Sequence, residues 1–187
     1  MLPAAIIHPQ DRFNEYKIVI EPSEKIISML NKELPAELFG FRQPQPEIML
    51  GAFYAKEGME PTISRWMERI CNLQGGFELR LNNFGGKPPG KIYIHVQDPF
   101  PLRQIINQMR MIDPFIQSSG CPAFWFNPAP ALELFQLPST VFSSALDILT
   151  DLDFNESFKA GVAKLYKRKG DRFDLLDSFI LPDNKLY

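Results

Sequence analysis

Apolar and polar residues alternate along seven stretches of the chain, and this period of two is typical of β-strands with one buried face. The stretches are residues 17–21, 46–54, 77–81, 91–96, 130–134, 158–166 and 173–181. Four other stretches repeat apolar residues at helical spacing, most clearly from Ile63 to Cys71. The other three helices are expected after Ser23, from Pro101 to Met109, and up to about Thr150.

The connections between these elements are rich in proline and glycine. Residues 34–46, 85–90 and 111–127 should form loops or turns, and residues 1–16 an irregular lead-in. The order of strands and helices predicts an α+β fold with mainly antiparallel pairing. No linker rich in proline, serine or glycine divides the chain, so one domain is expected over residues 1–187.

Composition narrows the class of protein. Hydrophobic residues make up 45% of the chain and charged residues 22%, the balance of an ordinary globular protein. No stretch approaches the roughly 20 apolar residues of a membrane span, and the first residues lack a signal-peptide pattern, so a soluble cytoplasmic protein is expected. The net charge of −2 gives no general attraction to nucleic acid. Cys71 and Cys121 fit no metal-site spacing, and we expect neither a metal nor a cofactor.

Two short strand-like stretches have matching patterns. Pro46-Glu47-Ile48-Met49-Leu50 is echoed later in the chain by Pro130-Ala131-Leu132-Glu133-Leu134. In the first, Glu47 and Met49 share one face, and in the second Ala131 and Glu133 do so. A proline is tolerated at the first residue of a strand, where no donor is needed.

These paired stretches resemble the motifs of the 2H phosphoesterases, the superfamily of 2′-5′ RNA ligases and cyclic phosphodiesterases. The resemblance covers about residues 17–182 and implies a two-lobed fold with a pseudo-two-fold axis. Antiparallel sheets would line a central cleft, with helices outside. Each motif of the family reads proline, histidine, any residue, threonine or serine. Here the motif positions hold Glu47, Met49, Ala131 and Glu133, so both histidines and both hydroxyl residues are absent.

The resemblance implies a chemistry that these residues do not supply. In the family one histidine accepts a proton and the other donates one, which suits a side chain whose pKa lies near neutrality. Ala131 transfers no proton, and Met49 donates no hydrogen bond to a phosphate. We therefore expect a protein that has lost the family reaction and binds a small ligand in the cleft. RNA or a nucleotide is implied as that ligand by the resemblance alone.

Two alternative functions remain open. In the first, Glu47, Glu133 and His95 form an altered acid–base or metal-binding group. Strand 91–96 places Tyr93 and His95 on its polar face, which should line the cleft, and Arg80 on strand 77–81 is a further candidate for ligand binding. His8, in the lead-in, is expected to be solvated.

In the second alternative the chain is a structural or protein-interaction module. Filling of the cleft by Phe53, Phe135 and Trp125 would favour this function. An open cleft would instead bring Glu47 and Glu133 into one partly desolvated space. Two carboxylates there resist ionising together, so one should titrate at a raised pKa, and a cationic or polyhydroxyl ligand would be preferred over a phosphate.

Overall fold

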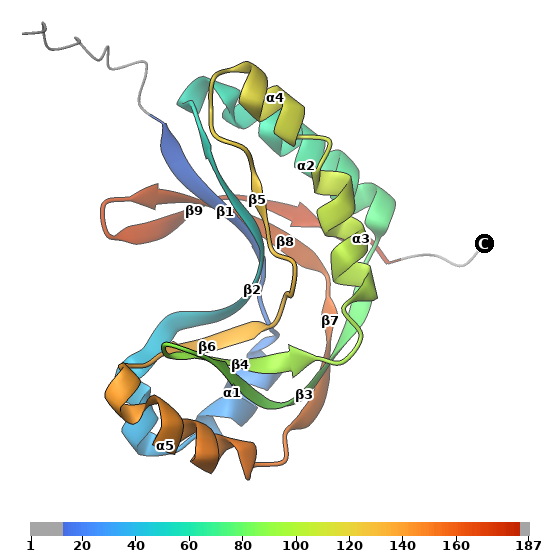
Figure 1. Ribbon diagram of the computed structural model, residues 1–187. Helices are drawn as coiled ribbons and strands as arrows, with labels where there is room; N and C mark the ends of the chain where they lie inside the picture. Colours follow the sequence, from blue (N-terminus) through green and yellow to red (C-terminus); the bar gives the residue numbers. More distant parts are fainter. Residues whose placement is uncertain (1–12, 184–187) are drawn as a thin grey trace, which may run out of the picture.

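The structure, a computed structural model, describes residues 13–183 and contains one strongly curved sheet with helices around it (Figure 1). The strands are β1 (Asn14–Ile20), β2 (Arg42–Ala55), β3 (Phe77–Lys87), β4 (Lys91–Val96), β5 (Trp125–Phe126), β6 (Leu132–Gln136), β7 (Asn155–Ala160), β8 (Val162–Lys169) and β9 (Arg172–Ile180). The α-helices are α1 (Glu24–Glu33), α2 (Glu60–Gln74), α3 (Phe100–Met109), α4 (Asp113–Ser118) and α5 (Ser139–Thr150). Short 3-10 helices span Ala36–Phe41 and Glu57–Met59.

The helices begin and end where the local sequence favours it. Helix α1 follows Ser23, whose hydroxyl accepts a hydrogen bond from the backbone N–H of Ile26. Helix α2 ends at Gly75, which has a φ of 69°. The side chains that α2 buries share the predicted face: Ile63, Met67, Ile70 and Cys71.

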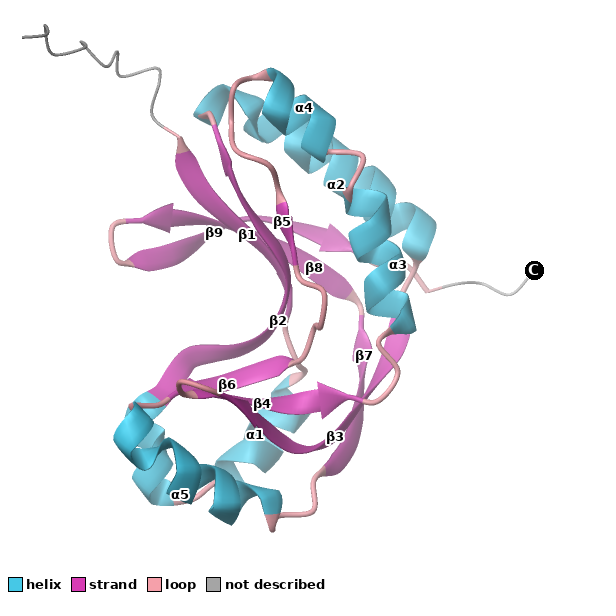
Figure 2. Ribbon diagram, in the orientation of Figure 1, coloured by secondary structure: helices cyan, strands magenta, loops and turns pink. Residues whose placement is uncertain are grey.

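The sheet is antiparallel, and its strand order is β7-β3-β4-β6-β2-β1-β8-β9, with β5 beside β2. The first lobe contains β3, β4, β6 and β7, the second contains β1, β8 and β9, and the long strand β2 curves through both (Figure 2). Helices α1 and α5 pack on the first lobe, and α2 and α3 pack on the second. The predicted two-lobed α+β fold, with antiparallel strands at the centre and helices outside, is confirmed.

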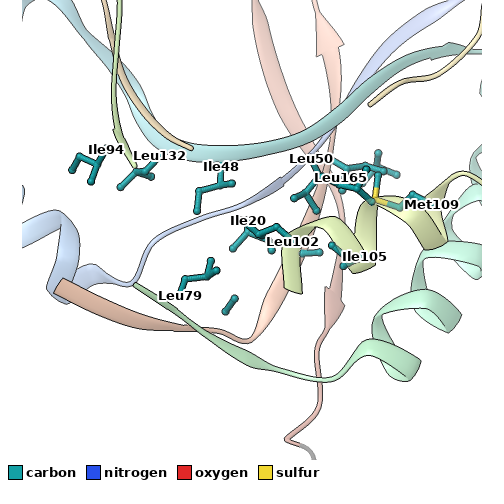
Figure 3. Close-up of a cluster of buried hydrophobic side chains, with 14 of the residues drawn as sticks. Ile20, Ile48, Leu50, Leu79, Ile94, Leu102, Ile105, Met109, Leu132 and Leu165 are labelled. Carbon is teal, nitrogen blue, oxygen red and sulfur yellow. The ribbon is translucent and has the colours of Figure 1, made fainter. Parts of the chain in front are cut away.

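The hydrophobic core lies beneath β2 and extends into both lobes (Figure 3). Ile48 and Leu50 of β2 are fully buried there, and Leu132 of β6 lies beside Ile48. Because side chains alternate along a strand, Glu47 and Met49 must face away from this core. The same alternation turns Glu133 away from it on β6.

Several element boundaries differ from the prediction. Strand β1 begins at Asn14, inside the predicted lead-in, and β2 begins at Arg42, inside the predicted loop 34–46. Both strands pair with neighbours on each side, and this pairing extends them beyond their local pattern. His8 lies outside the described residues, so its solvated position stays a prediction.

Regular structure also replaces parts of the predicted loops. Gly85 and Gly86, expected in a turn, lie inside β3, and residues 111–127 contain α4 and β5. The predicted strand 158–166 is divided at Gly161 into β7 and β8. The two halves pair with different lobes, β7 with β3 and β8 with β1, so they bend away from each other. The sheet is continuous through both lobes, and a single domain over residues 1–187 stays a prediction.

Candidate ligand-binding site

The two motif-like strands are neighbours at the middle of the sheet. Strand β2 pairs with β6, and Glu47 lies directly opposite Glu133 in the register. Opposed residues of antiparallel strands point to the same face, so both carboxylates belong to the face that turns away from the core. The two motif strands are central and their glutamates share one face, as expected, but of the two only Glu133 lines the cavity described below.

Glu47 is nearly buried and forms an ion pair with Lys17 of β1. The Lys17 Nζ lies 2.5 Å and 2.6 Å from the two carboxylate oxygens of Glu47. The ammonium group also lies over the ring of Phe173, 4.7 Å from its centroid, and 5.4 Å from that of Tyr166. Side chains of the protein itself therefore surround the Glu47 carboxylate.

Burial raises the pKa of Glu47 above its ordinary value. The hydrogen bond and charge of Lys17 oppose this rise, and the negative charge of Glu133 makes a smaller contribution in the upward direction. The direction is the one expected for one of the two carboxylates. Its main cause is desolvation, whereas the sequence suggested repulsion between the two glutamates.

Glu133 has a lysine partner of its own. The Lys91 Nζ of β4 lies 2.7 Å from the Glu133 Oε1, in a pair that is more exposed than the Lys17–Glu47 pair. Neither lysine is among the predicted site residues. Lys91 shares the alternation of Tyr93 and His95, so its face was readable from the sequence. The position of Lys17 beside Glu47 could not be predicted in this way, because it depends on the register between β1 and β2.

A cavity of about 540 Å³ opens beside Glu133. Its charged lining residues are Lys87, Lys91, Arg103 and Glu133, which gives three cations against one anion. The remaining lining residues are Tyr93, His95, Val96, Pro99, Trp125, Asn127, Pro128, Ala129, Pro130 and Ala131. The cavity has the size and mixed lining of a small-molecule site.

No protein-family model and no curated protein matches the sequence, but solved structures match the fold. A crystal structure of a phosphoesterase superposes with a TM-score of 0.64 at 20% identity, over 92% of this chain and 100% of that one. E. coli LigT complexed with 3′-AMP superposes with a TM-score of 0.65 at 21% identity, over 91% of this chain and 99% of that one. E. coli LigT complexed with NADP⁺ superposes with a TM-score of 0.64 at 22% identity, over 92% of this chain and 100% of that one. The chain has the 2H phosphoesterase fold.

Four of the predicted site residues meet in the cavity of this 2H phosphoesterase fold: Tyr93, His95, Ala131 and Glu133. Glu47 does not line the cavity, because it is only 6% exposed and is engaged by Lys17. Arg80 is exposed on β3 and does not line it either. Met49 is partly buried, and its carbonyl oxygen accepts a hydrogen bond from the Asn127 side chain.

The aromatic residues that were expected to decide whether the cleft is filled lie in different places. Phe53 and Phe135 belong to the core, at 2% and 0% exposure. Trp125 is 51% exposed and lines the cavity. Among residues 13–183, no group of three histidine, cysteine, aspartate or glutamate side chains is placed to hold a metal ion.

A glycine supports the two rings on the cavity floor. The rings of Tyr93 and His95 meet edge to face, with centroids 5.0 Å apart. A Cβ at Gly85 of β3 would lie 2.5 Å from His95 Nε2 and 2.8 Å from Tyr93 Cε2. The absence of a side chain at Gly85 therefore allows both rings to lie against β3.

Substituting Gly85 by alanine is expected to displace the His95 and Tyr93 rings and to lower the free energy of unfolding by about 1 kcal/mol, the low end for overpacking, because the exposed His95 ring can move aside. NMR chemical shifts of the His95 ring protons and urea unfolding measure the two effects. Unchanged His95 shifts in a folded Gly85→Ala variant would contradict this packing. Gly58→Ala, at a position with no neighbouring atom within 4 Å, is the control.

Proposed function

We propose that this protein binds a small ligand in the cavity beside Glu133 and does not catalyse the two-histidine phosphoester reaction. The carrying observation is the open cavity at the second motif position, combined with the residues at the motif positions themselves. Ala131 lines the cavity in place of a histidine. Glu47, which takes the place of the other histidine, is nearly buried and paired with Lys17.

The chemistry of the cleft supports loss of the family reaction. General acid–base catalysis requires two groups in complementary protonation states within reach of the substrate. A carboxylate already held by an ammonium group 2.5 Å away is a poor replacement for either histidine. His95 lines the cavity, but it lies on β4 and faces no second histidine among the lining residues.

We expect the purified protein to show no turnover above background on 2′,3′-cyclic phosphates or in the joining of 2′-5′ RNA ends. Product formation is measured by chromatography beside a 2H phosphoesterase that retains both histidines. Turnover that survives purification and is lost in Glu133→Gln would overturn the proposal. That result would instead support an enzyme with altered chemistry.

Ligand binding is tested by a thermal-shift screen of small molecules, since a ligand at about 100 times its Kd adds about 2.7 kcal/mol of stability. The blocking variant is Ala131→Phe, which places a large side chain in the cavity. The control variant is Ala123→Phe, on an exposed loop residue that does not line the cavity. Ligands that stabilise the wild type and Ala123→Phe but not Ala131→Phe support the proposal. If no compound stabilises the wild type, the proposal fails.

The second candidate function is an enzyme with altered acid–base chemistry, because Glu133, Tyr93 and His95 line one cavity. Glu47 contributes less to it than the sequence suggested, since it lies outside the lining. A structural or interaction module is the third, and the burial of Phe53 and Phe135 away from the cleft removes the feature that would have favoured it.

The proposal of a nucleotide or RNA ligand is supported only by the solved structures of E. coli LigT complexed with 3′-AMP and with NADP⁺. Those ligands belong to proteins about a fifth identical to this one. No helix among residues 13–183 has the length and apolar character to cross a membrane. A cytoplasmic location remains a proposal.

A further inference from the structure

We propose that the ligand of this cavity is an organic anion with an apolar, ring-like body, and that sugar-bearing anions bind poorly. This inference rests on the proposed function, and it names the chemical class of ligand for the same site. It also replaces the expected preference for cationic or polyhydroxyl ligands. That preference assumed carboxylates without cations, whereas Lys17 and Lys91 neutralise Glu47 and Glu133.

One end of the cavity is cationic. Lys87 of β3 lies opposite Lys91 of β4 in the register, and both side chains line the cavity. Glu133 offsets one of the two charges, so this end retains a net positive charge for an anionic group. Lysine ammonium groups bind phosphate and carboxylate oxygens alike.

The floor between the two ends is formed largely by two aromatic rings that meet edge to face. Lys91, Tyr93 and His95 follow one another on the same face of β4. The distance along the strand from residue 91 to residue 95 is about 13 Å, at 3.3 Å per residue. The Tyr93 and His95 rings lie along this floor, and Ala131 adds only a methyl group. A ring-shaped body fits this surface, and Ala131 leaves room for it.

The far end of the cavity offers few hydrogen-bonding groups. Its lining includes Val96, Pro99, Pro128, Pro130 and the exposed Trp125. Only Arg103, the Trp125 indole N–H and Asn127 are polar there.

The Asn127 side chain is already engaged within the protein. Its Nδ2 donates to the Met49 carbonyl oxygen at 2.8 Å, and its Oδ1 accepts from the Ala129 backbone N–H at 3.1 Å. Apart from the Arg103 guanidinium and the Trp125 indole N–H, hydroxyl groups buried against this end would find no free side-chain partner for the water they lose, which disfavours a sugar. An aromatic body would instead contact the Trp125 ring.

Calorimetric titration of the full-length protein with four probes tests the inference. The probes are inorganic phosphate, ribose 5-phosphate, 1-naphthyl phosphate and 2-naphthoate. We expect 1-naphthyl phosphate to bind at least about tenfold more tightly than ribose 5-phosphate, the difference that one well-placed aromatic contact supplies. Comparison of the two naphthyl compounds shows whether the anion is taken as phosphate, as carboxylate or as both.

Matched variants locate the two ends of the site. Trp125→Ser should weaken 1-naphthyl phosphate about tenfold and leave ribose 5-phosphate unchanged, because only the aromatic body contacts the indole. Lys87→Gln should weaken both phosphates. Tyr54→Ser, which removes an exposed aromatic ring that does not line the cavity, should change neither. Circular dichroism confirms that each variant is folded.

Ribose 5-phosphate binding as tightly as 1-naphthyl phosphate would overturn the apolar body and leave the proposed function standing. If none of the four anions binds but the screen finds another ligand that Ala131→Phe excludes, the inferred ligand class is overturned and the proposed function stands. If neither the anions nor the screen gives a ligand, the proposed function fails as well. Unchanged naphthyl affinity in a folded Trp125→Ser variant would also overturn the inference.

Discussion

Replacing Lys17 by methionine should lower the free energy of unfolding by about 3 kcal/mol at neutral pH, because it leaves a buried carboxylate without its cation. The side chains of Lys17 and Glu47 are only 15% and 8% exposed, so solvent screens the pair weakly. Urea unfolding followed by circular dichroism measures the loss. Lys25→Met is the matched control. Lys25 is 72% exposed and 3.8 Å from Glu156, so its loss should cost less than about 1 kcal/mol.

The deficit of Lys17→Met should depend on pH in a defined direction. Lys17 opposes the rise in the pKa of Glu47, so its removal raises that pKa further. The folded state then binds a proton more tightly than the unfolded chain, whose glutamates titrate near about 4.3. Linkage makes the contribution of Glu47 most favourable below that pH, and it is lost as the pH rises through the folded pKa. The deficit should therefore be smaller at about pH 5 than at about pH 8.

The double variant Lys17→Met/Glu47→Leu separates the ion pair from its packing. Replacing both charges by apolar groups removes the uncompensated carboxylate, so most of the lost stability should return. Additive losses in the double variant, or an equal Lys17→Met deficit at both pH values, would show that Lys17 stabilises the fold by packing alone.

Gly90→Ala is expected to destabilise the protein by about 3 kcal/mol, because the new methyl group would overlap the backbone. A Cβ at Gly90 would lie 1.8 Å from the Leu137 carbonyl oxygen. That carbonyl cannot move alone, since the Leu137 N–H donates to the Gly90 carbonyl at 2.8 Å and ties the two segments together. The melting temperature and urea midpoint measure the effect.

The control for Gly90→Ala is Gly161→Ala. Gly161 stands between β7 and β8, and a Cβ added there would meet no atom within 4 Å, so alanine should change stability by no more than about 0.5 kcal/mol. Equal effects at the two glycines would contradict the close approach at Gly90. Because Lys91 follows Gly90 directly, a folded Gly90→Ala variant should also bind ligand less well.

The local sequence was sufficient to predict helices α1, α2, α3 and α5 and most of the strands, but it did not predict α4. The stripe of α2 and the alternation of β4 depend on residues a few positions apart, whose spacing decides which face is buried. The two proline-led stretches also predicted two central strands, whereas their direct pairing with each other came from the structure. Their matching alternation determined that Glu47 and Glu133 face away from the core, because Ile48 and Leu132 must be buried.

Only the tertiary structure decided the chemistry of the cleft. The lysine partners of the two glutamates come from β1 and β4, and their positions depend on strand register, which a local pattern does not encode. The same register places Gly85 inside β3, under the His95 ring, although the local sequence around it is typical of a turn. The cavity is lined by β4, β6, the end of β3, β5, the start of α3 and the loop before β6, and only the packing of these segments brings Lys87, Arg103 and Trp125 around Ala131.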